Sequence, residues 1–448
     1  MRASVDVECG KVCDMPPKVR RVANSDLATL FRAKERVPAP KAIQEFALFE
    51  RLYRGIKTPS GAQIYLSEIA NRSFLRLVKT VETYLPSCAI ISSDEIYQAC
   101  EIEIGRMYEH EEPIKEIAAF LAMVEDYFKS EINTYRFYST IDGLYFTGVD
   151  QMRIGRLSLL IPDIAILEHC NSNEIMLNDT WKRMNHGLWV TVEITGSRKY
   201  AERRFFEDVR AACGLLAVSL TSSLERGCCG VRLIPSMGGR VRPSAATWFS
   251  IKTSTNDLST SSSMRGFLPI NIRDSDVKYL LASEWFVELT RIIQDENGSD
   301  VEKSVRRAIY WFFDAQADTS IEMQFVKFWS CIECFFSFDN SGQTTTKIKR
   351  GLTALLKLGN FGFSELDSWE SLEREIDALY DLRSLAVHNA NHSHVSEHHV
   401  IIASKWAAWT ILEVSGLISK GYKTRAQIKE QTDRLSEIFR QRSSQSQS

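Results

Sequence analysis

The stretch FVKFWSCIECFF, residues 325–336, is rich in aromatic and aliphatic side chains and contains neither Gly nor Pro. It predicts a strongly helical segment, which we place at about 319–338. Short punctuated gaps separate long amphipathic segments on both sides of it, and this arrangement favours an antiparallel helical bundle. The neighbouring helices are predicted at about 274–296, 300–316, 344–358, 367–390 and 396–420, and the whole helical domain at 266–442.

Working outward, the polar Ser/Thr-rich residues 253–265 are expected to be a linker, because they lack apolar periodicity. Upstream, short β-branched and aromatic runs near 144–146, 157–161, 188–194, 231–234 and 247–251 predict strands, with a helix at 199–218. The predicted organisation is a flexible arm (1–40), a helical region (41–135), an α+β recognition domain (136–252), the linker, the bundle and a solvated tail (443–448). The fold class expected is therefore multidomain, with an N-terminal helical plus α+β region and a C-terminal all-α bundle.

Composition sets limits on function. The 448 residues include 55 Lys and Arg against 57 Asp and Glu, so bulk charge does not attach this protein to nucleic acid, although a local basic groove could. We expect a cytoplasmic protein that does not span a membrane, because we find no secretory signal and no apolar run of roughly 18 to 20 residues. Its 10 Cys are then expected to be mostly reduced. They do not form two CxxC pairs, so the sequence does not indicate a structural zinc site.

The strongest chemical signal is Arg383, followed five positions later by His388, on a predicted helix that is otherwise apolar. An imidazole can move a proton to or from a ribose hydroxyl near neutral pH. A guanidinium can hold the phosphate and stabilise its charge. The spacing alone is weak, since 34 Arg and 8 His give about 0.6 such pairs by chance, and a helix-capping His with a structural Arg is the ordinary alternative. Because residues five apart lie about 140° apart around a helix, both can face one cleft only if the helix ends or kinks near His388.

The surrounding segments resemble the HEPN superfamily, and most closely the Apea-like HEPN proteins of bacterial anti-phage defence. The resemblance covers about 270–420 and is carried by residues 310–315, 325–336, 347–350 and 382–389; residues 192–196 add weaker support. It implies a homodimeric helical bundle in which two Arg/His pairs form one ribonuclease cleft. It also implies that Arg383 holds phosphate, that His388 is catalytic and that Glu333 orients Arg383. Ser384 completes the expected catalytic set; it stands where the family often has Asn or another larger polar residue, and it keeps a hydrogen-bonding oxygen with a shorter reach.

We therefore expect an endoribonuclease that needs no metal or other cofactor and that cuts RNA by 2′-hydroxyl attack. Its partners would be the RNA substrate, a second copy of the chain and a trigger from phage or host. The same resemblance allows an alternative, a non-catalytic protein that dimerises or binds RNA or a nucleotide. The residues expected to contact RNA are Lys347, Lys349, Arg350 and Asn389.

Other patterns offer rival sites. Asp163 and Glu193 suggest a magnesium-dependent nuclease, but Thr195 stands where that arrangement needs Lys. His394 and His398 could share a helix face and bind a metal, although a polar helix start is the simpler interpretation. Cys331 and Cys334 form a CxxC inside a helical segment, which favours packing cysteines over a redox pair.

Overall fold

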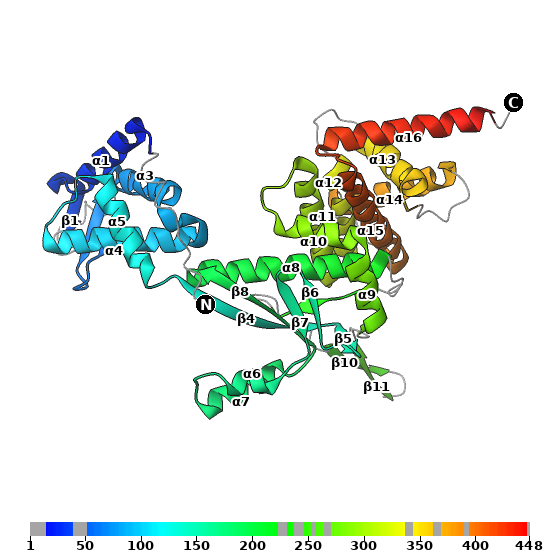
Figure 1. The fold of residues 1–448 in the computed structure, drawn as a ribbon, viewed down its shortest axis with the longest axis horizontal. Helices are drawn as coiled ribbons and strands as arrows, with labels where there is room; N and C mark the ends of the chain where they lie inside the picture. Colours follow the sequence, from blue (N-terminus) through cyan, green and yellow to red (C-terminus); the bar gives the residue numbers. More distant parts are fainter. Residues whose placement is uncertain are drawn as a thin grey trace. The chain divides into compact units, whose positions relative to one another are not determined.

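The computed structural model describes residues 15–38, 52–222, 231–236, 246–252, 257–263, 270–336, 344–361, 369–388 and 394–445 (Figure 1). The chain divides into two units, one within residues 1–137 and 193–205 and the other within 138–192 and 206–448. The division differs from the predicted domains, because it passes through two long strands and one long helix instead of through a linker.

The N-terminal unit combines helices with a small sheet. In this sheet β3 is the central strand and pairs antiparallel with both β1 and β2. The elements are α1 (Pro17–Leu30), η1 (Ala33–Glu35), β1 (Arg36–Pro38), β2 (Leu52–Lys57), β3 (Gln63–Ser67), α3 (Glu68–Tyr84), η3 (Pro86–Ile90), α4 (Ser93–His110) and α5 (Ile117–Lys129).

Two predictions for this unit were wrong. Residues 41–135 are not helical throughout, because β2 and β3 lie within them; Thr58, Gly61 and Ala62 close the turn between these strands through backbone hydrogen bonds. The expected flexible arm contains α1, in which Leu27 and Leu30 are fully buried. Only a tertiary core can hold such a short, weakly patterned helix in place.

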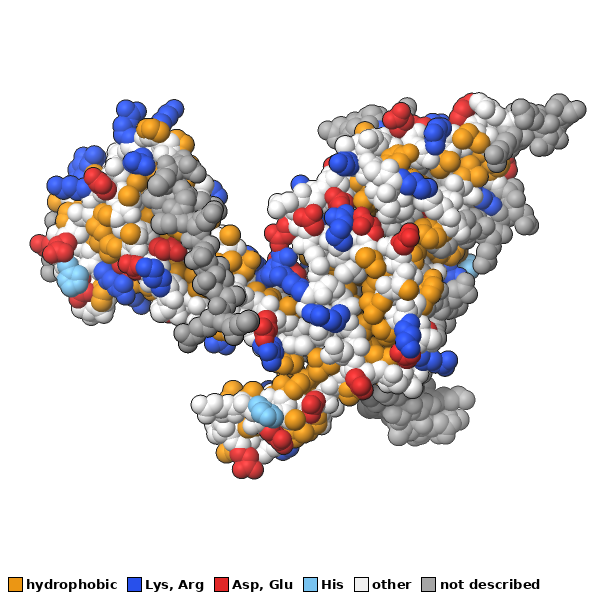
Figure 2. Space-filling model, viewed as in Figure 1, with side chains coloured by type: hydrophobic (Ala, Val, Ile, Leu, Met, Phe, Trp, Pro, Cys, Tyr) orange, Lys and Arg blue, Asp and Glu red, His pale blue; other side chains and the backbone are white. Residues whose placement is uncertain are grey.

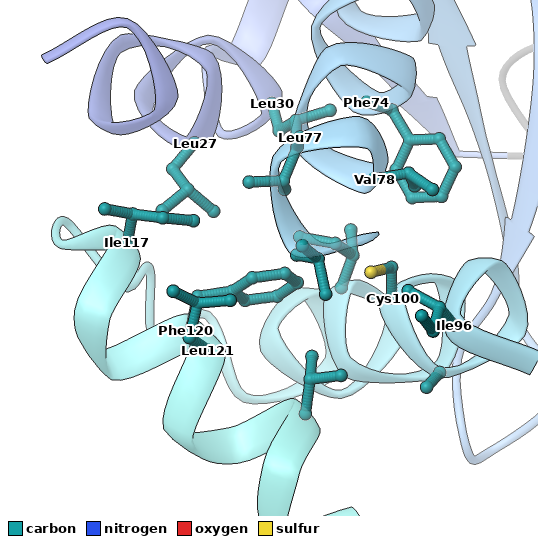
Figure 3. Close-up of a cluster of buried hydrophobic side chains, with 14 of the residues drawn as sticks. Leu27, Leu30, Phe74, Leu77, Val78, Ile96, Cys100, Ile117, Phe120 and Leu121 are labelled. Atoms are coloured by element: carbon teal, nitrogen blue, oxygen red, sulfur yellow. The ribbon is translucent and has the colours of Figure 1, made fainter. Parts of the chain in front are cut away.

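The core of the N-terminal unit lies between α1, α3, α4 and α5. Figure 3 shows Leu27 and Leu30 of α1 directed toward Leu77 of α3 and Phe120 of α5. Helix α3 begins at Ser67, whose hydroxyl accepts from the amide of Ala70. Helix α4 begins with a reciprocal capping box between Ser92 and Glu95.

The second unit contains most of the β structure. Its larger sheet has the order β6-β7-β8-β4-β9, and β12 pairs in parallel with β5. Three of its elements, β4, β8 and α8, are shared with the N-terminal unit. The elements are β4 (Asn133–Asp142), β5 (Leu144–Thr147), β6 (Gln151–Ile154), β7 (Leu157–Leu160), α6 (Ile164–Glu168), α7 (Glu174–Met184), β8 (Leu188–Gly196), α8 (Arg198–Ser222), β9 (Ile234–Pro235), β10 (Ala246–Lys252), β11 (Asp257–Ser263) and β12 (Ile270–Arg273). The strands predicted near 144–146, 157–161, 188–194 and 247–251 and the helix at 199–218 are confirmed, but of the strand predicted at 231–234 only Ile234 lies in a strand, β9. The expected linker is wrong for residues 257–263, which pair antiparallel with β10.

The remaining residues of this unit form the predicted helices. The segment expected at 274–296 is two helices, and α16, which was not predicted, extends through residues assigned to the tail. The helices are α9 (Asp274–Ala282), α10 (Glu284–Gln294), α11 (Asp300–Ala317), α12 (Ile321–Phe336), α13 (Thr344–Leu358), α14 (Trp369–His388), α15 (Glu397–Ser419) and α16 (Arg425–Gln445). The chain is thus mixed, α+β in its N-terminal part and helical in its C-terminal part.

Helix α15 packs against α10, α11, α12 and α13. Among the described helices it alone is long and apolar enough to cross a membrane, and 61% of that apolar stretch is buried inside the protein. A central helix of a bundle has the same length and composition, because it must be apolar on several sides.

Candidate functional site

The structure brings together two of the predicted site residues, Glu333 and Arg383. Glu333 lies on α12 and Arg383 on α14, and the two helices pack against each other. Arg383 Nη2 donates to Glu333 Oε2 at 2.8 Å, and the side chains are 17% and 18% exposed. A charge-assisted hydrogen bond with little exposure fixes the guanidinium in one direction.

The electrostatics of this pair are set by burial. Burial raises the pKa of Glu333, and the charge and hydrogen bond of Arg383 oppose that rise. The Arg383 Nε is buried and has no hydrogen-bond partner among the described residues. This N–H of the guanidinium is therefore a donor that the described residues do not use, as is the Nε of Arg210.

Aromatic side chains hold the two helices beneath the pair. The guanidinium carbon of Arg383 lies 5.8 Å from the ring centre of Tyr380, one turn earlier on α14. Tyr380 also meets the fully buried Trp329 of α12 edge-on, with ring centres 5.6 Å apart. Trp329 contacts Trp406 of α15 in the same way at 6.3 Å. These contacts give the ion pair a rigid support.

His388 is the last described residue of α14, and residues 389–393 lie outside the described part of the chain, so the expectation that the helix ends or kinks there stays a prediction. The side chain of His388 lies outside the described residues, as does Asn389. Ser384, next to Arg383, is partly exposed. Leu385 and Val387 on the same turns are 37% and 45% exposed, so this end of α14 presents apolar side chains to solvent.

The predicted RNA-binding residues of α13 already have acidic partners. Lys349 Nζ lies 2.8 Å from Asp377 of α14, and Arg350 Nη1 lies 3.5 Å from Asp433 of α16. These ion pairs join α13 to its neighbours, so the expected free basic groove is not present at these two side chains. Lys347 is on the same helix and also has an interaction partner.

Cys334 follows Glu333 in the sequence and lies on the same helix, α12. Burial raises the pKa of the Cys334 thiol to about 11 even though the charges of Arg307 and Arg425 lower it. Arg307 comes from α11 and Arg425 from the start of α16, where Arg425 forms an ion pair with Asp300. A thiol held protonated in this way also supports the packing interpretation of Cys331 and Cys334.

The rival sites do not gain support. Asp163 caps α6 by accepting from the amide of Ala165 at 3.0 Å, and Glu193 forms an ion pair with Arg136. His399 and Ser396 exchange hydrogen bonds in a capping box at the start of α15. Within the described ranges, no group of three His, Cys, Asp or Glu side chains could hold a metal ion.

A pocket of about 100 Å³ lies elsewhere in the second unit. Neither Glu333 nor Arg383 lines it, and it therefore does not extend the candidate site. Its walls come from α8, the 231–232 segment, α11, α12 and α15, including Thr221, Arg232, Phe312, Gln324, Phe328 and Glu397.

Comparison with known proteins gives no relative: no family model, no curated protein and no solved structure matches this chain.

Proposed function

We propose that the protein is a metal-independent endoribonuclease of a bacterial anti-phage defence system, with its active site formed where two copies of the chain meet. The observation that carries the proposal is the pairing of Arg383 with Glu333, both singled out from the sequence, on the helix that also carries His388. Glu333 would orient Arg383 toward the scissile phosphate.

The chemistry follows from the two side chains. One imidazole of His388 takes the proton of the ribose 2′-hydroxyl, and the 2′-oxygen forms a bond to phosphorus. The bond from phosphorus to the 5′-oxygen breaks, and the imidazole of the second copy donates a proton to this leaving oxygen. Arg383 neutralises the charge that develops on the non-bridging oxygens. The products are a 2′,3′-cyclic phosphate and a 5′-hydroxyl.

A second copy is part of the proposal because one chain supplies a single His388. The exposed Leu385 and Val387 support it, since apolar side chains beside a charged site are suited to a subunit interface. Twofold symmetry would place the same turns of both α14 helices together. A trigger from phage or host would then control a cytoplasmic enzyme that otherwise damages its own cell.

The test uses the purified full-length chain and end-labelled RNA in the presence of EDTA. Wild-type protein should release fragments with cyclic phosphate ends, and His388→Ala and Arg383→Ala should each slow cleavage by at least about a hundredfold. Arg374→Ala is the matched control, because Arg374 is exposed on the same helix and bonds only to Glu370 and Ser371 there. It should cut like the wild type.

Expression in bacteria provides a second readout if the enzyme needs its trigger. Bacteria that express the wild-type protein should stop growing when phage infects them. The His388→Ala variant should relieve this arrest. If His388→Ala protein cuts RNA at the wild-type rate, the catalytic assignment is wrong. If wild-type protein binds RNA but leaves it intact even in infected-cell extract, the non-catalytic alternative replaces the proposal.

A further inference from the structure

Charge is strongly segregated in the N-terminal unit. Residues 17–36 contain six basic and two acidic side chains, whereas residues 94–131 contain eleven acidic and three basic ones. The first range covers α1 to β1, and the second covers α4 and α5. Figure 2 shows blue side chains gathered along the part of this unit that α1 forms in Figure 1. The near-neutral net charge of the whole chain conceals this separation.

The two acidic residues of the basic range are engaged inside the unit. Asp26 is buried and accepts from Arg76 of α3, with Nε–Oδ2 at 3.1 Å. Glu35 is also buried and accepts a hydrogen bond from Ser67. Four exposed side chains, which we call the basic edge, have no acidic partner within the described part of the chain: Lys18, Arg20, Arg21 and Arg32.

Three residues of the basic edge, Lys18, Arg20 and Arg21, lie on the firmly held helix α1, and Arg32 follows its end. The inner side of α1 buries Ala23, Leu27 and Leu30. The side chain of Asn24 accepts from the amide of Ile117 at 2.7 Å, and Tyr108 donates to the carbonyl of Leu30 at 3.0 Å. The cations are thus carried by a rigid element, which limits the entropy lost when a ligand is bound.

The positions of these cations are unfavourable for the helix itself. Lys18, Arg20 and Arg21 occupy the first two turns of α1, and its first turn contains no acidic residue. The positive end of the helix dipole repels cations there, and no ion pair with a described residue compensates. A local arrangement that costs stability without compensation in the fold indicates a ligand.

We propose that the basic edge binds the sugar–phosphate backbone of double-stranded nucleic acid without reading its sequence. Unpartnered guanidinium and ammonium groups on a rigid helix suit phosphates spaced along a duplex. The exposed side of α1 lacks the aromatic side chains on which single-stranded bases stack. Its only large exposed apolar residue is Val22, which is too little for insertion into a membrane or for an apolar protein interface. The proposal does not rest on ribonuclease activity.

Binding is measured by fluorescence anisotropy with full-length protein and fluorescein-labelled 20-base-pair duplexes of DNA and RNA, over a range of salt concentrations. Arg20→Gln/Arg21→Gln should weaken binding to both duplexes by roughly tenfold. It should also make the dependence of log K on log salt less steep by about 1.8 for DNA, the value for two lost phosphate contacts. Lys115→Gln/Lys129→Gln is the charge-matched control from the acidic range and should leave affinity unchanged.

Lys18→Gln provides an independent single variant, with a smaller loss in the same direction. Equal affinity of the Arg20/Arg21 variant and wild type, or equal weakening by the control variant, would overturn the proposal. So would preferential binding to a single strand, or binding to phosphatidylserine vesicles with none to either duplex. Circular dichroism confirms that each variant keeps the helix content of the wild type.

Discussion

The arginine at the α12–α14 contact and the arginines of the basic edge have opposite surroundings. At the first, Arg383 is held by a partly buried glutamate and rests on an aromatic side chain. At the second, Arg20 and Arg21 are exposed and have no acidic partner among the described residues. The comparison teaches that an arginine built into a helix contact is held in one orientation by its partners, whereas arginines on the outside of a helix keep their hydrogen-bond donors available to a ligand. The following predictions test this difference.

The largest effect should come from removing the aromatic support. Trp329→Ala empties a fully buried site between α12, α14 and α15. It should lower the free energy of unfolding of the second unit by about 3–5 kcal/mol. Hydrogen exchange should show lost protection in α12 and α14 and unchanged protection in α1. Phe120→Ala, in the core of the N-terminal unit, should have the reverse effect: protection should be lost in α1 and unchanged in α12 and α14. Equal loss across all helices in both variants would mean that the two regions do not have separate cores.

Removing the acid at the α12–α14 contact should have the next largest effect. Glu333→Ala leaves the guanidinium of Arg383 partly buried without its counter-charge, and should cost about 2–3 kcal/mol in urea unfolding. Glu333→Ala/Arg383→Met should recover part of that loss, because no unpaired charge remains. A double variant no more stable than the single one would show that the pair is not coupled as described.

The pH dependence of stability separates two kinds of glutamate in the second unit. Burial opposes ionisation of Glu302, but hydrogen bonds from Arg291 and Ser299 outweigh it and lower its pKa to about 2. The stability that ionised Glu302 contributes to the folded state is therefore present above its unfolded pKa of about 4.3. It is lost as the pH falls toward 2. Burial raises the pKa of Glu333. The stability that protonated Glu333 contributes to the folded state is therefore present below its unfolded pKa, and it is lost as the pH rises through its folded-state pKa.

Urea unfolding between pH 2 and 7 should show these opposite slopes. Glu302→Gln should flatten the profile below pH 4.3, and Glu333→Gln should flatten it above that value, each by about 1 kcal/mol, since Arg291 is half exposed and screened. Parallel profiles for wild type and both variants would contradict these assignments.

The smallest effect is expected at the basic edge. Arg20→Gln/Arg21→Gln should change the free energy of unfolding by no more than about 0.5 kcal/mol, and in the stabilising direction, because it removes cations from the positive end of α1. Thermal denaturation followed by circular dichroism measures it. A loss above about 1 kcal/mol would mean that these arginines are structural.

Most of the C-terminal helices could be predicted, because the spacing of apolar residues that identifies a helix is a local feature of the sequence. The aromatic run at 325–336 and the gaps around it locate α12 and its neighbours within a few residues. The strands β2 and β3 were missed, because a half-exposed hairpin in a small sheet has a weak period and obtains its stability from the helices above it. The serine-rich β11 looked like a linker because polar composition hides a backbone that is paired with β10.

The candidate site divides in the same way. The sequence by itself determined the residue types: an Arg and a His five apart, a Glu inside an apolar helix, and a basic start to α1. Only the tertiary structure decided which charges are paired, because an acid can neutralise a base from 50 positions away, as Glu333 does for Arg383, when two helices pack together. The same physics left Lys349 engaged with Asp377 and Arg20 and Arg21 free, which no local pattern of charges could have distinguished.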